Sequence, residues 1–232
     1  MLAVQINPGD RADMVLVPAG EFLMGSDDSD YAKPQHGVYL DDYWIYKMPV
    51  TVAQYRKFCE ATQRAMPDAP SWSWKDDHPA VNVTWHDARA YCEWTGVGLP
   101  TEAQWEKAAR GTGGRKYPWG DRWDVRRCAN SVGRNNLAST LPVGSYPSGA
   151  SPYGCLDMAG NVWEWCADWF GRNYYQCGID RNPPGPEQGM YRVLRGGSWF
   201  DYGPGSFRCA HRYGFAPDVR YSYFGFRCVS CT

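Results

Sequence analysis

The sequence predicts an α+β fold with little regular secondary structure, and three observations lead to this prediction. The 232 residues include 25 glycines, 17 prolines and 12 tryptophans, whereas isoleucine occurs only at Ile6, Ile45 and Ile179. A chain rich in indole rings and poor in aliphatic residues favours irregular loops fixed by large side chains. Three short segments carry helix-start signals, and strand-like segments lie near both ends. Because no linker, internal repeat or low-complexity run divides the chain, we expect a single domain over residues 1–232 whose ends meet in one sheet.

Three helices are expected to begin at residues 51, 84 and 101. Each start has a threonine, followed three residues later by an amide or a carboxylate: Thr51 with Gln54, Thr84 with Asp87, and Thr101 with Gln104. The hydroxyl can accept from a free backbone amide at the helix start while the later side chain reaches back, which is the capping box. Gly111 is expected to end the third helix.

The strand signals are weaker than the helix signals. Residues 15–25 alternate apolar and small side chains and predict a hairpin, and residues 39–45 predict another strand. Residues 110–192 are expected to be mostly loop, interrupted by an ordered segment over 160–169. The C-terminal part is expected to supply strands near Val193, Arg208 and Phe226.

Charge and hydropathy exclude several classes of partner. A formal net charge of -1 gives no electrostatic case for binding nucleic acid or an anionic membrane. The first residues show no basic segment followed by an apolar stretch, and no stretch reaches the length of a membrane span. We therefore expect a cytoplasmic protein without signal peptide or membrane insertion.

Nine cysteines are spread along the chain, and an odd number without an export signal argues against a disulfide scaffold. Cys228 and Cys231 are spaced like half of a zinc site, but there is no second such pair and the four histidines lack ligand spacing. Plain thiols are therefore favoured over zinc.

Residues 192–228 combine two kinds of position. The framework residues are Arg192 to Trp199, Arg208, Arg212, Pro217, Asp218, Arg220 and Gly225 to Arg227. The slot residues between them look interchangeable: Phe200, Asp201, Tyr202, Ser206, Phe207, His211, Tyr213, Gly214, Phe215, Ala216, Val219, Tyr221, Ser222 and Tyr223. No Lys or Glu follows Glu187. Large aromatics mixed with small polar residues, without Lys or Glu, are typical of antibody-like binding surfaces, so this region indicates recognition.

Several phrases in order resemble the formylglycine-generating-enzyme/sulfatase-modifying-factor domain, a variant of the C-type lectin fold. They include Pro18 to Ser26, Pro79 to Trp85, Leu99 to Glu106, Tyr117 to Gly120, Gly160 to Trp165, Arg195 to Trp199 and Gly225 to Arg227. The resemblance covers about residues 15–229 and implies that fold for the chain. Because one fold hosts several activities, the function is argued from the site.

In the formylglycine-generating enzymes, two cysteines bind copper, two and seven residues after the aromatic that closes the Gly-Gly-Ser phrase. Here these positions hold Asp201 and Ser206, which cannot supply thiolate ligands, so the resemblance implies no such catalysis. Cys209 matches a framework position beyond the pair. A second branch of the family binds iron through histidines, but the four histidines here, His36, His78, His86 and His211, show no paired spacing.

The pattern of residues 192–228 is most similar to the variable proteins of diversity-generating retroelements, in which a reverse transcriptase rewrites the C-terminal coding stretch. The mutated codons yield nearly any residue except Lys and Glu. The resemblance implies a hypervariable, solvent-facing surface that binds an unknown protein or other macromolecule, with no cofactor required. Two alternatives stay open: a divergent oxidase, in which Asp201 and His211 would help to hold a metal, and an inactive accessory domain.

The resemblance also implies a possible structural calcium site. Asp157 and Glu164 would contribute side-chain oxygens, and Gly160 and Val162 would contribute carbonyls, all suited to a hard cation. The alternative is that Glu164 and Asn161 hold the loop by hydrogen bonds alone. A second site near Asn130, Ser131, Asn135 and Leu137 is doubtful, because asparagine stands where aspartate is usual.

Cys92 and Cys228 match positions that lie side by side in the family, and Cys209 lacks a partner because Ala109 occupies the matching position. Trp163, Trp165 and Trp169 are expected to belong to the core rather than to a ligand platform.

Overall fold

The two ends of the chain share one sheet, as predicted. The computed structural model describes residues 3–29, 31–133 and 138–231. Within it, β1 (Val4–Ile6), β2 (Asp13–Val17), β5 (Tyr43–Tyr46) and β10 (Val229–Cys231) form an antiparallel sheet in that order. Strand β10 is an edge strand and pairs with β5, whose residues lie almost two hundred positions earlier in the sequence.

The predicted hairpin over residues 15–25 is wrong. Strand β2 pairs with β5, whereas β3 (Gly20–Met24) pairs with β4 (His36–Leu40) in a separate two-stranded sheet. The predicted strand over residues 39–45 is likewise divided, since two exposed residues, Asp41 and Asp42, separate β4 from β5. Alternating side chains predict that a strand forms, but the choice of partner depends on segments distant in the sequence.

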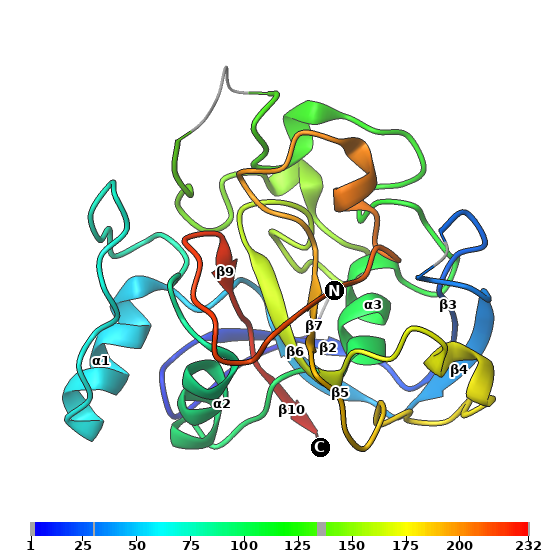
Figure 1. Cartoon of the computed structure of the whole chain (residues 1–232), viewed down its shortest axis with the longest axis horizontal. Coiled ribbons are helices and arrows are strands. Elements are labelled where there is room, and N and C mark those ends of the chain that lie inside the picture. The colour runs from blue at the N-terminus through cyan, green and yellow to red at the C-terminus, as the bar shows by residue number, and fades with distance from the viewer. Residues whose placement is uncertain (1–2, 30, 134–137, 232) are drawn as a thin grey trace.

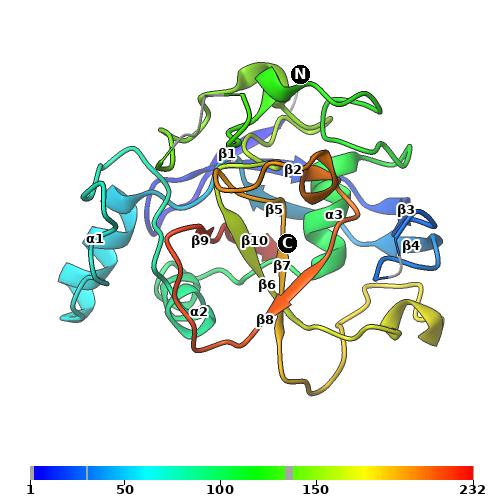
Figure 2. The same cartoon turned by 45° about the horizontal axis from the view of Figure 1, so that its top comes forward.

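The third sheet contains three of the four C-terminal strands. Its order is β8 (Tyr213–Phe215), β7 (Arg192–Arg195), β6 (Trp163–Trp169) and β9 (Phe224–Gly225), with β6 and β9 parallel. Figure 2 shows β8 in front of β6 and β7, with the following segment running past α2 to β9. The strand predicted near Arg208 is wrong: a 3-10 helix covers Pro204–Phe207, where proline removes a backbone donor.

All three predicted helix starts are confirmed. Helices α1 (Val52–Thr62), α2 (Trp85–Trp94) and α3 (Glu102–Arg110) each begin with a complete capping box on the predicted threonine. Gly111 follows α3 with φ +70°, as expected for a helix-ending glycine. In Figure 1, α1 and α2 lie at one side of the molecule, whereas α3 lies close to β6 and β7 in the middle.

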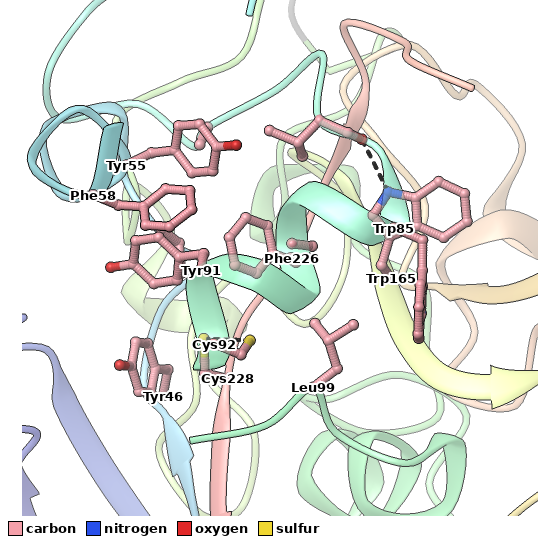
Figure 3. Close-up of a cluster of buried hydrophobic side chains, with 14 of the residues drawn as sticks. Tyr46, Tyr55, Phe58, Trp85, Tyr91, Cys92, Leu99, Trp165, Phe226 and Cys228 are labelled. Atoms are coloured by element: carbon pink, nitrogen blue, oxygen red, sulfur yellow. Dashed lines mark hydrogen bonds between the residues drawn. The ribbon is translucent and has the colours of Figure 1, made fainter. Parts of the chain in front are cut away.

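An aromatic core joins α1 and α2 to the C-terminal strands (Figure 3). The rings of Tyr55, Phe58, Tyr91 and Phe226 pack on one another with centroids 5.3–6.3 Å apart. The indole of Trp165 donates to the Val83 carbonyl over 3.1 Å. Trp163 and Trp165 are buried, which confirms the core prediction for both, and Trp169 is half-buried.

Within the described residues, every helix is too short or too polar to cross a membrane.

Candidate ligand-binding surface

Three framework arginines are buried and ion-paired. Arg227 forms a bidentate ion pair with Glu164, in which Nε and Nη2 donate to the carboxylate oxygens over 2.6 and 2.8 Å. Arg212 pairs with Glu102 in the same way, with Nε and Nη2 each 2.6 Å from a carboxylate oxygen. Arg195 pairs with Glu106 and, over 3.4 Å, with Glu102. Such charge-assisted pairs have a fixed geometry, so they hold the backbone on either side of the slots.

The buried carboxylates on α3 depend on these arginines. Burial opposes ionisation of Glu102, but the guanidinium groups of Arg212 and Arg195 outweigh it and hold the pKa of Glu102 below its usual value. The carboxylate is therefore charged at neutral pH. Loss of either arginine would leave a buried charge with less compensation.

The main chain of the slots is held by groups that are not slot side chains. Five slot carbonyls accept hydrogen bonds: Asp201 from Ser131 N (3.0 Å), His211 from Arg195 Nη1 (2.9 Å), Tyr221 from Asn82 N (3.1 Å), Ser222 from Trp199 Nε1 (3.1 Å) and Tyr223 from Trp163 N (2.8 Å). At these five positions the backbone is therefore held without using the slot side chains; the Asp201 carboxylate, described below, is an exception. Sequence reasoning missed the role of Asn82 and considered Ser131 only for a calcium site, because contacts made by a backbone amide leave no pattern in residue type.

Several slot side chains form a continuous exposed surface. We call Phe200, Tyr213, Phe215, Tyr221 and Tyr223 the aromatic surface. Tyr223 stacks between Phe200 and Tyr221, with ring centroids 5.7 and 5.0 Å away, and the contacts continue through Phe215 to Tyr213. Phe200 is 61% exposed, Tyr213 45% and Tyr221 37%. Tyr202, 79% exposed, also faces solvent.

The aromatic surface rests on several buried rings of the core. Tyr213 contacts Trp163 with ring centroids 5.5 Å apart, and Phe200 contacts Trp199 at 5.6 Å. Phe224, which is fully buried, contacts Phe215, Tyr221 and Tyr223 with centroids 5.0–5.5 Å apart. Phe215 and Tyr223 are consequently half-buried, with part of each ring available to a ligand. The remaining small slots, Ser206, Gly214, Ala216, Val219 and Ser222, are also half-buried.

Phe207 contradicts the expectation that the slots face solvent. Its ring is fully buried and stacks on Trp123 at 5.0 Å. A Cβ at Gly197 would lie 2.9 Å from this ring, and Gly197 has φ +74°, so the glycine leaves room for Phe207. Phe207 therefore belongs to the core.

Asp201 has a local structural role. Its Oδ2 accepts from the backbone amide and the hydroxyl of Ser198, over 3.0 and 2.7 Å, and from the indole of Trp163 over 3.0 Å. Three donors on one oxygen fix the turn that presents Phe200. Asp201 is thus engaged within the protein rather than free as an adaptable contact.

His211 is half-buried beside Trp163, with ring centroids 5.7 Å apart. Burial, reinforced by the charge of Arg195, lowers the pKa of His211 to about 4. The imidazole is therefore neutral at physiological pH and can donate or accept a hydrogen bond, but it does not carry a positive charge to a ligand.

The groups around Asp201 do not form a metal centre with the described residues. No group of three or more His, Cys, Asp or Glu side chains in the described part of the chain is arranged to hold a metal ion. Cys209 is buried, and burial raises its thiol pKa to about 12, so it is not a thiolate at neutral pH.

The predicted calcium ligands divide into two groups. Both oxygens of Glu164 bind Arg227, and Oε2 also accepts from the Trp105 indole over 2.7 Å. A calcium ion on Glu164 would face this guanidinium, so Glu164 in this arrangement does not fit a calcium ligand. Asp157 is different: it accepts from Gly144 N over 2.7 Å, and burial raises its pKa to about 6.

Calcium held by Asp157 with Gly160 and Val162 stays a prediction. The hydrogen-bonded alternative has support from Asn161, whose side chain accepts from Leu141 N over 3.0 Å and donates to its carbonyl over 3.2 Å. Of the doubtful second site, Asn135 and Leu137 lie outside the described residues. Asn130 donates to the carbonyls of Val125 and Cys128, and Ser131 donates to the Asp201 carbonyl.

The predicted proximity of Cys92 and Cys228 is confirmed. Their sulfur atoms lie 3.2 Å apart in the aromatic core, and the two thiols are free (Figure 3). Cys209 and Ala109 are likewise both buried in the second core cluster.

The fold and the buried framework define a class of protein. Residues 3–231 match the model of the sulfatase-modifying factor enzyme 1-like domain, so the chain belongs to this family. It is 36% identical to the formylglycine-generating enzyme of Streptomyces coelicolor, over 96% of this chain and 90% of that enzyme. It is 37% identical to the serine/threonine-protein kinase pkn1 of Chlamydia caviae over 94% of this chain, but it spans only 38% of that kinase.

Solved structures show the same fold. PvdO from Pseudomonas aeruginosa superposes with a TM-score of 0.84 at 26% identity, covering 98% of this chain and 97% of PvdO. Treponema denticola variable protein 1 superposes with a TM-score of 0.81 at 24% identity, covering 99% of each chain. The predicted family and the predicted α+β, C-type lectin-like fold are therefore confirmed.

Proposed function

We propose that this chain is a ligand-binding variable protein of a diversity-generating retroelement. It displays slot side chains from residues 192–228 on a C-type lectin-type scaffold, and it recognises a protein or another macromolecule without catalysing a reaction. The observation that carries this proposal is the set of main-chain carbonyls held by donors other than slot side chains. A backbone held in this way keeps its shape when exposed side chains change.

The chemistry of the surface supports binding. Exposed tyrosine and phenylalanine rings provide rigid contact area at low entropic cost, and such residues dominate binding hot spots. The rings form one continuous patch, whereas apolar residues on the surfaces of solitary proteins are usually scattered. The likeness to Treponema denticola variable protein 1 supports the scaffold, not the ligand.

The competing enzyme class has one supporting observation, the 36% identity to a formylglycine-generating enzyme. Asp201 and Ser206 stand where the copper-binding cysteines would be, and Asp201 is already engaged by Ser198 and Trp163. We expect no copper-dependent oxidation of a cysteine-containing peptide. Turnover above a copper-only control would contradict the proposal.

A combinatorial library tests the proposal directly. Phe200, Tyr202, Tyr213 and Tyr221 are randomised together, and the library is displayed and selected against immobilised lysozyme and streptavidin. We expect most members to resist protease as the parent does, because substitutions of exposed side chains cost within about 0.5 kcal/mol each. We also expect binders. Widespread unfolding, or a folded library without binders, would contradict the display function.

The gene neighbourhood tests the retroelement part separately. We expect a reverse-transcriptase gene and a near-copy of the stretch encoding residues 192–228 that differs mainly at adenines. A neighbourhood without these features would contradict that part and leave the display function to the library experiment.

A further inference from the structure

The loop between α1 and α2 borders the aromatic surface, although it lies more than a hundred positions earlier in the sequence. The half-buried Trp72 contacts Trp199 edge-on, with ring centroids 5.3 Å apart. Trp199 in turn contacts Phe200, with ring centroids 5.6 Å apart. Trp199 therefore lies between Trp72 and the aromatic surface. Figures 1 and 2 both show this loop beside the segment that leads to β9.

Asn82 holds this loop and the slot backbone together. Its side-chain amide donates to the Asp68 carbonyl over 2.9 Å, and its backbone amide donates to the Tyr221 carbonyl over 3.1 Å. Asn82 has φ +57°, a left-handed conformation that is uncommon for a residue other than glycine. One residue in an unusual conformation therefore sets the position of Trp72's loop relative to Tyr221.

The turn that contains Trp72 is also constrained. Ser73, at φ +67°, closes a turn by donating to the Pro70 carbonyl over 2.9 Å. Pro70 is buried, whereas Ser73 is exposed. Left-handed backbone at such residues persists only where the surrounding structure holds it, and it is often found at binding sites. The turn keeps Trp72 at the border of the aromatic surface.

The shape of this region favours a large partner over a small molecule. Small-molecule sites are concave. Two hollows of the protein lie elsewhere: one of about 420 Å³ is lined by Asp28 and Lys116, and one of about 530 Å³ by Trp119 and Arg126. A run of exposed rings suits a folded protein, whose interfaces cover roughly 800 Å² on each side.

Several charged groups at the border have partners within the protein. Arg220 pairs with Asp87 over 2.9 Å, His86 lies 3.4 Å from Asp218, and Asp201 is engaged by Ser198 and Trp163. A partner with an apolar, largely uncharged patch matches such a surface better than a strongly charged one.

We propose that Trp72 is a fixed anchor of the binding surface, and that the partner is a folded protein presenting an apolar patch that covers Trp72 together with the slot rings. This inference rests on the proposed function. Because Trp72 lies outside residues 192–228, it makes the same contact whatever the slots contain. Variation would then adjust specificity around a constant aromatic anchor.

The experiment uses several independent lysozyme binders from the slot library. Trp72→Ala is introduced into each, and Trp119→Ala serves as the matched control. Trp119 is another half-buried tryptophan, and its ring packs on Tyr117 and Trp123 rather than on the slots. We expect Trp72→Ala to weaken lysozyme binding by at least about tenfold in most binders and the control to change it by less than about threefold.

The outcomes separate the two proposals. Equal, small effects of both substitutions would overturn the role of Trp72 while leaving the display function intact. A folded library without protein binders would instead refute the display function. If Trp72→Ala fails to fold, hydroxyl-radical footprinting of the unsubstituted binders decides: protection of Trp72 by lysozyme supports the anchor, and unchanged oxidation overturns it.

Discussion

Two sets of positions within residues 192–228 have opposite surroundings. The framework arginines Arg195, Arg212 and Arg227 are at most 2% exposed and are paired with glutamates of α3 and β6. The slot tyrosines Tyr213 and Tyr221 are 45% and 37% exposed. Framework and slot residues are interleaved in the sequence, and we expect the loss of a buried arginine to cost more stability than the loss of an exposed tyrosine. Such a difference would keep the fold independent of the exposed side chains.

The largest effect is expected at Arg227. Arg227→Met removes the partner of the fully buried Glu164 and the donors to the Tyr46 and Leu156 carbonyls. An uncompensated buried charge lowers the free energy of unfolding by about 3–5 kcal/mol. Denaturant unfolding measures this loss in the free energy of unfolding. The matched control is Arg220→Met, which breaks a surface pair with Asp87 and should cost less than about 1 kcal/mol. Equal losses would refute the expectation that burial makes the Arg227–Glu164 pair more important for stability than the surface pair.

Two phenylalanines in the slots sharpen the comparison, because they differ only in their surroundings. Phe207 is fully buried, whereas Phe200 is 61% exposed. Phe207→Ala should lower the free energy of unfolding by about 3–4 kcal/mol, since it leaves a cavity against Trp123. Phe200→Ala should change it by about 0.5 kcal/mol or less. Thermal and denaturant unfolding of both variants measure this difference. If Phe207→Ala is as stable as the parent, Phe207 is not a core residue.

A smaller, pH-dependent effect is expected at Asp157. Burial raises its pKa from 3.8 to about 6 in the folded state, so the folded state favours the protonated carboxyl. This contribution to stability is complete below about pH 4 and is lost as pH rises through 6, amounting to about 2–3 kcal/mol. Asp157→Asn, at a φ of +55° that asparagine tolerates, should remove this dependence.

Calcium binding to Asp157 would instead make the parent more stable at neutral pH. The difference in stability between the parent and Asp157→Asn is measured from pH 4 to 7, with calcium and with EDTA. If calcium binds Asp157, it will stabilise the parent at pH 7 and leave the variant unchanged. A flat difference in EDTA would show that Asp157 is ionised without cost, contrary to its burial.

The smallest effects are expected at the exposed tyrosines. Tyr213→Ser and Tyr221→Ser should each change the free energy of unfolding by about 0.5 kcal/mol or less, because most surface substitutions do so. Phe215→Ser and Tyr223→Ser should cost more, since both rings are half-buried, whereas Tyr213 and Tyr221 are exposed. Melting temperatures of the four variants give the ranking. A large loss at Tyr213 would show that the aromatic surface supports the fold.

The helix starts and the family were predictable, whereas much of the site was not. Thr51, Thr84 and Thr101 act within four residues of sequence, so local chemistry was sufficient. The partner of β2 and the burial of Phe207 depend on segments far away in the chain. Asn82 and Trp72 reach the candidate site from outside the C-terminal region. Asn82 lies in a family motif, but nothing in the residue types indicated that either residue reaches this site.

By itself, the sequence determined the helix starts, the family and the alternation of framework and slot residues, because each is recorded in residue types at short spacing. Only the tertiary structure decided which slots are solvent-exposed and which charges are paired. Phe200 and Phe207 are the same residue type, and only Phe207 is stacked on Trp123. Glu164 could serve a metal or an arginine, and the packing of β6 near the C-terminal segment places Arg227 against it. Burial and pairing are properties of contacts between distant segments, and residue type at one position does not specify them.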